Sequence, residues 1–218
     1  MMTLIKIKSP KIYEKIESFE KSVNIYLEEE YPIYDSLVSN EEYVREIFNK
    51  IECNRCKFEN IVFQECSFKN TTFQDIIFES CDFSNGNFEG AYFRRCLFVS
   101  CKGIGTYLQK TTFKQVLFKN SNFRYAYFDE ANFKEVWFEE VDLSEASLSQ
   151  CKLEKINFTQ TKLIKNNFFK TPLKGIDFSN NEFVAPTVSE PHVELRGLTV
   201  DRFQAAELAK LMGICIVE

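Results

Sequence analysis

Large hydrophobic residues recur at every fifth position of this chain, from Phe58 to Phe183. The 26 positions of this register hold 19 Phe, 6 Leu and a single Gly, Gly103. Only four of the chain's 23 Phe lie outside the series, namely Phe19, Phe48, Phe169 and Phe203. An amphipathic helix has a period of 3.6 residues and a half-buried strand a period of 2, so neither accounts for the spacing. A fixed-period repeat therefore determines the fold.

The position two residues before each Phe or Leu is also regular. It holds small or β-branched residues, such as Cys56, Ile61 and Ala91, and the other three positions of each unit are mostly polar. Each unit of five residues thus sends one large and one small side chain inward and three side chains outward. Large and small residues that alternate in this way can fill a narrow core without voids.

Several five-residue units closely match a known consensus. Cys81–Asn85, Ala131–Glu135 and Val141–Glu145 each place Asp or Asn before a central Phe or Leu. In this respect the chain resembles the pentapeptide-repeat family. The resemblance implies an all-β solenoid, a right-handed quadrilateral β-helix in which four units form one square coil and residues 20 apart stack. Its coils would pair as parallel strands about 4.8 Å apart. One side of the core would then hold a ladder of Phe58, Phe78, Phe98, Phe118, Phe138, Phe158 and Phe178.

The sequence divides the chain into three parts, with helices expected at both ends of the repeat. Residues 1–50 are predicted to be a helical segment that packs on or caps the solenoid, residues 51–185 the repeat, and residues 186–218 a C-terminal cap. Residues 1–8 read as a short strand. A helix is then expected from Ser9-Pro10, an N-cap residue followed by Pro, to a stop at Tyr31-Pro32. Its buried stripe would be Ile12, Ile16 and Phe19.

A second N-terminal helix is predicted between the first helix and the repeat. Ser39 and Glu42 have the spacing of a capping box, which indicates a helix from there to about Asn49. Its buried face would consist of Val44, Ile47 and Phe48.

The C-terminal residues predict a cap for the open end of the solenoid, which would otherwise expose core and strand edges. We expect a helix from about Val200 to Met212, with Thr199 as its N-cap and Gly213 as its stop, and then a strand over residues 214–217. This tail resembles the C-terminal module of the Qnr and mycobacterial quinolone-resistance branch of the family. The matching residues are Val193, Leu195, Gly197, Gln204, Leu208, Leu211, Gly213 and Ile214. The resemblance implies a homodimer through the C-terminal helix, with Leu195, Leu198, Phe203, Leu208, Leu211 and Met212 as its candidate interface.

One outward column of the predicted solenoid is apolar where solvent is expected. With residues 20 apart stacked, Ile77, Leu97, Leu117 and Trp137 form this column and Val99 lies beside it. Exposed apolar stripes usually mark contacts. Two interpretations stay open: the N-terminal helices cover the column, or it is a surface for a partner or a second copy.

The Phe and Leu register is interrupted once, in the middle of the repeat. Gly103 takes the place of a Phe, and Gly105 follows two residues later. Glycine within a strand often marks a bulge or a bend. We therefore expect a bulged turn, tilted coils or a kinked rod at this point.

Charge and hydropathy exclude several classes of function. The formal net charge is −5, so nothing in the overall charge favours binding to nucleic acid or to acidic lipid. The longest apolar runs are far shorter than a membrane span, and the first ten residues lack the apolar core of a signal peptide. These observations predict a protein of the cytoplasm with no direct contact to membrane or nucleic acid. Residues 58–183 carry 15 basic and 16 acidic side chains, which imitates a polyanion poorly.

The cysteines and the single histidine do not form a recognisable reactive site. The chain holds eight Cys, most of them at the small inward position, where Cys serves as a compact hydrophobic residue. Cys53 and Cys56 have zinc-ligand spacing, but no second pair follows. Cys81 and Cys101 would stack in adjacent coils, close enough that their redox state stays open. His192 has no evident nucleophile as a partner. We therefore expect no enzyme, no metal, no cofactor and no small-molecule substrate.

Two functions remain, both without catalysis. The resemblance implies a DNA mimic that binds DNA gyrase or topoisomerase IV and protects it from quinolones. The alternative is a general scaffold for protein–protein interaction, with the apolar column or the charged ends as its binding surface. The absence of inserted loops between Phe58 and Phe183 departs from many members of the Qnr branch.

Overall fold

The computed structural model describes residues 5–217. Its strands in chain order are β1 (Glu14–Lys15), β2 (Ile33–Tyr34), β3 (Ser36–Ser39), β4 (Glu42–Val44), β5 (Glu52–Asn54), β6 (Lys57–Glu59), β7 (Val62–Gln64), β8 (Thr72–Gln74), β9 (Ile77–Glu79), β10 (Tyr92–Val99), β11 (Thr112–Lys119), β12 (Asn132–Glu139), β13 (Lys152–Thr159), β14 (Lys162–Ile164) and β15 (Glu182–Val184). The helices are α1 (Phe19–Glu29), the 3₁₀ turn η1 (Val193–Leu195) and α2 (Arg202–Leu211).

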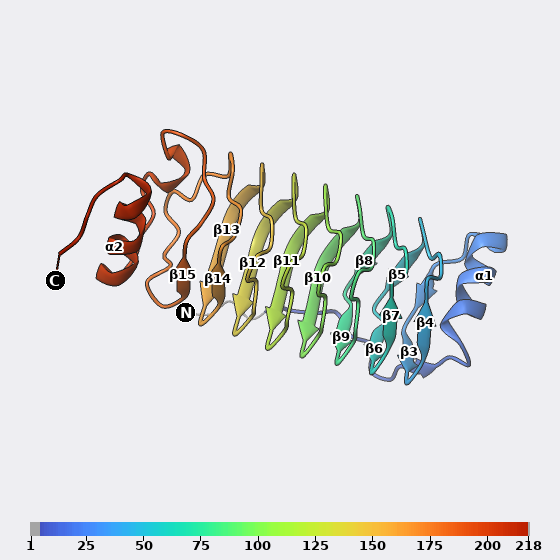
Figure 1. Cartoon of the computed structure of the whole chain (residues 1–218). Coiled ribbons are helices and arrows are strands. Elements are labelled where there is room, and N and C mark those ends of the chain that lie inside the picture. Colours follow the sequence, from blue (N-terminus) through green and yellow to red (C-terminus); the bar gives the residue numbers. More distant parts are fainter. Residues whose placement is uncertain (1–4, 218) are drawn as a thin grey trace.

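The strands stack as the successive coils of a solenoid (Figure 1). Strands β10, β11, β12 and β13 pair in parallel one after another, and each residue faces the residue 20 positions further along the chain, as Phe98 faces Phe118. A 20-residue coil made of five-residue units has four sides. The predicted quadrilateral β-helix is thus confirmed, with about nine turns.

One residue in each five-residue unit turns the chain at a corner. It lies two positions after the Phe or Leu, and at every such position from Asn60 to Ala185 except Asn180 it has a positive φ, for example 56° at Asn60 and 49° at Asn120. This left-handed backbone is least costly for Gly and Asn, and Gly90, Gly105 and Gly175 occupy corner positions. The corner residue directs the following unit onto the next side of the coil.

The core consists of stacked rings and of small side chains that bond to the backbone. Ring centroids along the ladder lie 4.8 Å apart from Phe78 to Phe98 and 4.6 Å apart from Phe98 to Phe118. At the small position, Thr111 Oγ1 donates a hydrogen bond to the carbonyl of Phe88 at 2.9 Å, which lies 23 residues earlier. The Cys96 thiol and the Asn166 Nδ2 group at this position donate the same kind of bond, so these buried donors gain partners inside the core.

The solenoid begins earlier than the Phe and Leu register suggests. The helix predicted from Ser39 to Asn49 is wrong: β3 and β4 lie there, and in place of a buried face Val44 and Ile47 are 44% and 69% exposed. The reason is that the five-residue register continues backwards with other residues in the large inward position, all of them buried: Ile33, Val38, Tyr43, Phe48 and Cys53. Pairing with the following coil outweighs the local preference of the Ser39–Asn49 segment for helix.

The first helix is shorter than predicted and begins later. α1 starts after Ser18 rather than at Ser9-Pro10, and Ile12 is 84% exposed instead of lying on a buried stripe. Its end before Tyr31-Pro32 is as predicted. Residues 5–8 do not form the predicted strand, whereas residues 1–4 lie outside the described residues. The segment before α1 is extended and runs lengthwise along the coils (Figure 1).

Helix α1 closes the N-terminal end of the core. Phe19 is fully buried, and its ring centroid lies 5.0 Å from that of Phe48 and 5.2 Å from that of Phe58. The carboxylate of Glu41 accepts a hydrogen bond from the backbone N–H of Phe19 at 3.0 Å and also bonds to the Tyr43 hydroxyl. A coil residue thus satisfies one of the free N–H groups at the start of the helix.

The C-terminal helix agrees with its predicted span, but its N-cap residue and the segment that follows it differ from the prediction. Asp201, not Thr199, is the N-cap: its Oδ1 accepts from the N–H groups of Phe203 and Gln204 at 2.7 and 2.8 Å. Thr199 instead continues the coil pairing, because its carbonyl accepts from Phe178 N at 2.9 Å. Gly213 has a φ of 73° and ends the helix as predicted. The predicted strand over residues 214–217 is absent, and Ile214 N instead donates to the carbonyl of Ala209 in α2 at 3.2 Å.

The interruption at Gly103 does not bend the rod. Parallel bridges connect Asp82, Lys102 and Asn122 in succession, and Gly103 N donates to Asn122 O at 2.7 Å, as in the other coils. The predicted bulge or kink is therefore wrong. A Cβ atom on Gly103 would collide with the ring of Phe123 from the next coil, so glycine makes room for that ring. Gly105 is an ordinary corner residue with a φ of 66°.

Candidate interaction surfaces

The C-terminal end of the rod exposes several apolar side chains. Phe203 is 67% exposed and Met212 72%, and Leu211 is also exposed. After the helix, Ile214, Ile216 and Val217 are exposed as well. The predicted dimer residues fall into two groups. Phe203, Leu211 and Met212 are exposed, whereas Leu195, Leu198 and Leu208 are half-buried against the core. The candidate interface therefore divides into an inner set that holds the cap and an outer set that faces solvent.

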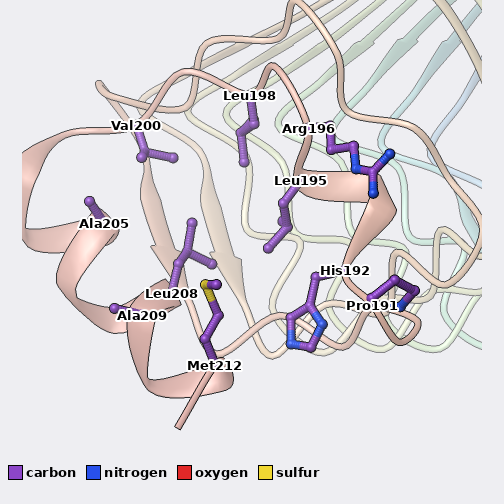
Figure 2. Close-up of a pocket in the computed structure, with 10 residues that line it drawn as sticks. All are labelled: Pro191, His192, Leu195, Arg196, Leu198, Val200, Ala205, Leu208, Ala209 and Met212. Carbon is purple, nitrogen blue, oxygen red and sulfur yellow. The ribbon is translucent and has the colours of Figure 1, made fainter. Parts of the chain in front are cut away.

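A cavity of about 400 Å³ opens between α2 and the segment that carries η1 (Figure 2). Leu195, Leu208 and Met212 point into it from opposite sides (Figure 2). His192 lies at its edge, where the ring Nε2 is 3.2 Å from the carbonyl oxygen of Leu211. The side chains that line the cavity include no cysteine, serine or carboxylate, so His192 has no nucleophile beside it there.

Gln204 connects α2 to the last coil. Its side chain is buried, and its Nε2 donates hydrogen bonds to the carbonyl oxygens of Phe178 and Asn181 at 3.0 and 2.7 Å. Its Oε1 accepts from Asp201 N at 2.9 Å. One side chain thus satisfies two carbonyls at the open end of the solenoid and also completes the helix cap.

The predicted apolar column is aligned as expected. Ile77, Leu97, Leu117 and Trp137 face one another in register from β9 to β12, with Lys57 before the column and Asn157 after it. All four are half-buried, and so is Val99 on the same side of the coil. The column therefore belongs neither to the core nor to a fully solvated surface.

An extended N-terminal segment borders this column, and no helix covers it. Residues 5–9, which we call the N-terminal strap, enclose a cavity of about 610 Å³ together with Arg95, Gln115, Glu135 and Trp137. The backbone N–H of Lys8 donates to Asp75 Oδ1 at 2.9 Å. The N-terminal helix therefore does not cover the column, because α1 packs on the end of the core.

The strap is attached at a buried ion pair. Asp75 is 1% exposed and receives Arg95 Nε and Nη2 at 2.6 and 2.5 Å. The hydrogen bonds to Asp75 raise the pKa of the Arg95 guanidinium above its already high value. Asp75 therefore binds the side chain of the next coil and the backbone of the strap at the same time. Sequence reasoning did not single out this residue, although the alternation Ile5-Lys6-Ile7-Lys8 was a signal for an extended segment.

Surface charges are paired between adjacent coils. Lys102 Nζ lies 2.9 Å from Asp82, and Lys155 Nζ lies 3.2 Å from Glu135, in both cases across 20 residues. The hydrogen bond from Gln115 and the nearby Lys155 lower the pKa of Glu135. Because acids and bases alternate along the columns, the rod presents balanced charge instead of the single sign that a polyanion mimic requires.

Burial makes most thiols unreactive. It raises the pKa of Cys96 and of Cys151 to about 12, and that of Cys56 to about 11. All eight cysteines are free, including Cys81 and Cys101, and only Cys215 is exposed. Cys53 and Cys56 occupy the large and the small inward positions of adjoining units. Within residues 5–217, no three His, Cys, Asp or Glu side chains group as metal ligands would.

Neither α1 nor α2 is long and apolar enough to cross a bilayer, and the described residues contain no other α-helix.

Comparison with known proteins agrees with this architecture. A model of the pentapeptide repeat region matches residues 72–148, and a model of eight pentapeptide repeats matches residues 48–85 and 142–180. Together they span residues 48–180 without a gap, which is more than half of the chain. No curated protein matched the sequence.

Solved structures provide a likeness in fold. A trypsin-treated variant of QnrB1, a plasmid-mediated fluoroquinolone resistance protein, has 20% identity and a TM-score of 0.52, over 83% of this chain and 97% of its own. A second such variant gives the same identity and TM-score over 94% of this chain and 97% of its own. HetL, involved in heterocyst differentiation in the cyanobacterium Nostoc, has 9% identity and a TM-score of 0.39 over 84% and 95%. The repeat register, the coil geometry and the matching models agree: the chain belongs to the pentapeptide-repeat family.

Proposed function

We propose that this protein is a non-catalytic binding rod that pairs through its C-terminal end and presents the sides of the solenoid to other proteins. The exposed apolar end supports this most strongly. Phe203, Met212 and Val217 are each at least two-thirds exposed at this end. Apolar surface gathered in one place usually marks a contact with another protein.

The half-buried and exposed residues at this end have different roles in the proposal. Leu195, Leu198 and Leu208 hold α2 on the core, so replacing them alters the cap itself. Phe203 and Leu211 are exposed, and Met212 is 72% exposed although it also lines the cavity beside α2. In the proposal these three side chains bury their exposed surface when a second copy binds. A two-fold contact between identical ends buries the same residues on both copies.

Replacement of Met212 by Glu tests the pairing without disturbing the cap. Met212 is 72% exposed, so the change should leave thermal unfolding almost unaltered and convert the dimer to a monomer in light-scattering mass measurements. The matched control is Phe169→Glu, since Phe169 is 38% exposed on the side of the rod. A particle that keeps the mass of a dimer in Met212→Glu would refute this interface, as would a wild-type protein that is monomeric at high concentration.

We also propose a cytoplasmic location. Seven buried cysteines without disulfides fit a reducing compartment. The balanced surface charge fits a rod that binds proteins rather than nucleic acid.

Binding to DNA gyrase or topoisomerase IV is the second candidate function. The fold likeness to QnrB1, described as a fluoroquinolone resistance protein, favours it. The charge pairing along the coils speaks against a close imitation of DNA. Gyrase supercoiling with ciprofloxacin distinguishes the two: a gyrase-binding protein should restore supercoiling at a stoichiometric amount. A general scaffold should leave the inhibition unchanged even in excess.

A further inference from the structure

We propose that Arg95, Gln115, Glu135 and Trp137, beside the last member of the apolar column, form the floor of a docking groove for an extended protein segment. The N-terminal strap occupies this groove as a built-in competitor. The segment that fits is one with aliphatic side chains at alternate positions. This site is separate from the C-terminal end and does not depend on pairing there.

The strap has the form of such a segment. Ile5 and Ile7 are half-buried, whereas Lys6 and Lys8 are exposed, which is the alternation of an extended chain with one face against a surface. An extended chain advances roughly 3.3 Å per residue and coils are about 4.8 Å apart, so three residues span about two coils. Lys8 bonds to Asp75, and Ile5 therefore reaches the coil of Gln115, two coils further on, whose side chain lines the same cavity.

The strap fills the groove incompletely. A cavity of about 610 Å³ remains between it and Arg95, Gln115, Glu135 and Trp137, a volume within the range of protein ligand sites. Atoms that line such a gap lack partners and lose dispersion contacts. A segment with a larger side chain in place of Ile5 would regain those contacts beside Trp137.

The strap is also held weakly enough to be exchanged. Over residues 5–9 its only hydrogen bond to the rod is the one from Lys8 to Asp75, and regular pairing starts only at β1. A partner can use the same carboxylate, since Asp75 keeps its ion pair with Arg95 in either case. The exchange therefore leaves the coils intact.

Trp137 is the single tryptophan of the chain, so its fluorescence reports on the groove. In the full-length double variant Ile5→Ser/Ile7→Ser, its emission should shift to longer wavelength and become easier to quench with acrylamide. A peptide of residues 5–16 should reverse the shift and bind this variant about tenfold or more tightly than it binds the wild type, because the strap no longer competes. The matched control is Lys6→Ser/Lys8→Ser, which changes the exposed face of the strap and should behave as wild type.

Several results would overturn the proposal. Unchanged Trp137 emission in the double variant would mean that the strap does not cover Trp137. Equal peptide affinity for wild type and variant would exclude competition. Peptide binding that persists in calorimetry when Trp137→Glu is added to the double variant would place the peptide elsewhere. The solution mass reports C-terminal pairing independently, so a failure of either proposal leaves the other measurable.

Discussion

At the scale of single residues, the fold depends on two positions that tolerate few side chains. The corner residue of each unit has a positive φ, and the large inward residue must fit between the rings of the neighbouring coils. Each constraint acts alone at one glycine, the backbone conformation at Gly175 and the packing at Gly103. Gly175 has a φ of 80° and open space around it, whereas Gly103 has an ordinary backbone and the Phe123 ring against it.

We expect Gly103→Ala to destabilise the protein by roughly 1–3 kcal/mol through overpacking. Gly175→Ala should cost about 1 kcal/mol through backbone strain alone. Urea unfolding monitored by circular dichroism measures both. Adding Phe123→Leu should recover part of the loss at Gly103, because Leu143 and Leu163 occupy the same column in later coils. It should recover nothing at Gly175, and equal recovery at both sites would contradict the packing argument.

Thiol reactivity follows from burial. The pKa of Cys96 and Cys151 is raised to about 12, so the neutral thiol dominates in the folded protein at any ordinary pH. At pH 8 we expect Ellman's reagent to titrate at most one thiol, Cys215, in the native protein and all eight after unfolding.

The same pKa shifts make stability depend on pH. A thiol whose pKa is raised by folding contributes its full stability below the unfolded pKa of about 8.5. That contribution is lost as the pH rises toward 12, so stability should decline on the alkaline side. In the titration with Ellman's reagent, rapid reaction of several thiols in the native state would show that the core is more open than described.

At the scale of elements, the helices are stable because they close the solenoid and not because of their own propensity. α1 has two buried side chains, Phe19 and Val23, and α2 has one, Gln204. Short isolated helices are marginal in water, so packing on the coil ends must supply their stability.

Phe19→Ala should destabilise the protein by about 3–5 kcal/mol, since it removes a fully buried ring from the end of the core. Ile25→Ala on the same helix is the control, because Ile25 is 51% exposed and its loss should change the free energy of unfolding by roughly 0.5 kcal/mol or less. Thermal and urea unfolding measure both variants. Equal effects would mean that α1 does not seal the core.

At the scale of the whole molecule, the rod has two unlike ends and evenly charged sides. About nine coils with a spacing of about 4.8 Å give a solenoid roughly 43 Å long. Pairing through the C-terminal ends would place two rods end to end, whereas pairing through the apolar column would place them side by side.

Small-angle scattering can distinguish these arrangements. The proposed end-to-end dimer should have a maximum dimension about twice that of the Met212→Glu monomer. A dimer with nearly the same maximum dimension as the monomer would point to the sides of the rod and contradict pairing through α2.

Much of the fold could be predicted from the sequence. The five-residue register specifies which side chains face inward, because every unit repeats the same contacts with the units 20 residues before and after it. The C-terminal helix and its stop at Gly213 were also predicted, because a glycine that ends a helix is a local signal, although the N-cap is Asp201 and not Thr199. The apolar column followed directly from the stacking of residues 20 apart.

The rest depended on contacts between distant segments. The coils that begin at Ile33 were missed because the five-residue register continues there with Val38, Tyr43 and Cys53 in place of Phe or Leu. Only their burial against the following coil shows that they belong to the series. The absence of a bend at Gly103 depended on the Phe123 ring of the next coil.

The sequence by itself determined the repeat, its inward positions and the C-terminal helix, because these follow from short-range spacing. Only the tertiary structure decided where the free ends of the chain lie. Phe19 seals one end, Gln204 joins α2 to the other, and the strap reaches Asp75 across 67 residues. Such contacts leave no periodic trace in the sequence, since each is made once and depends on the shape of the finished rod.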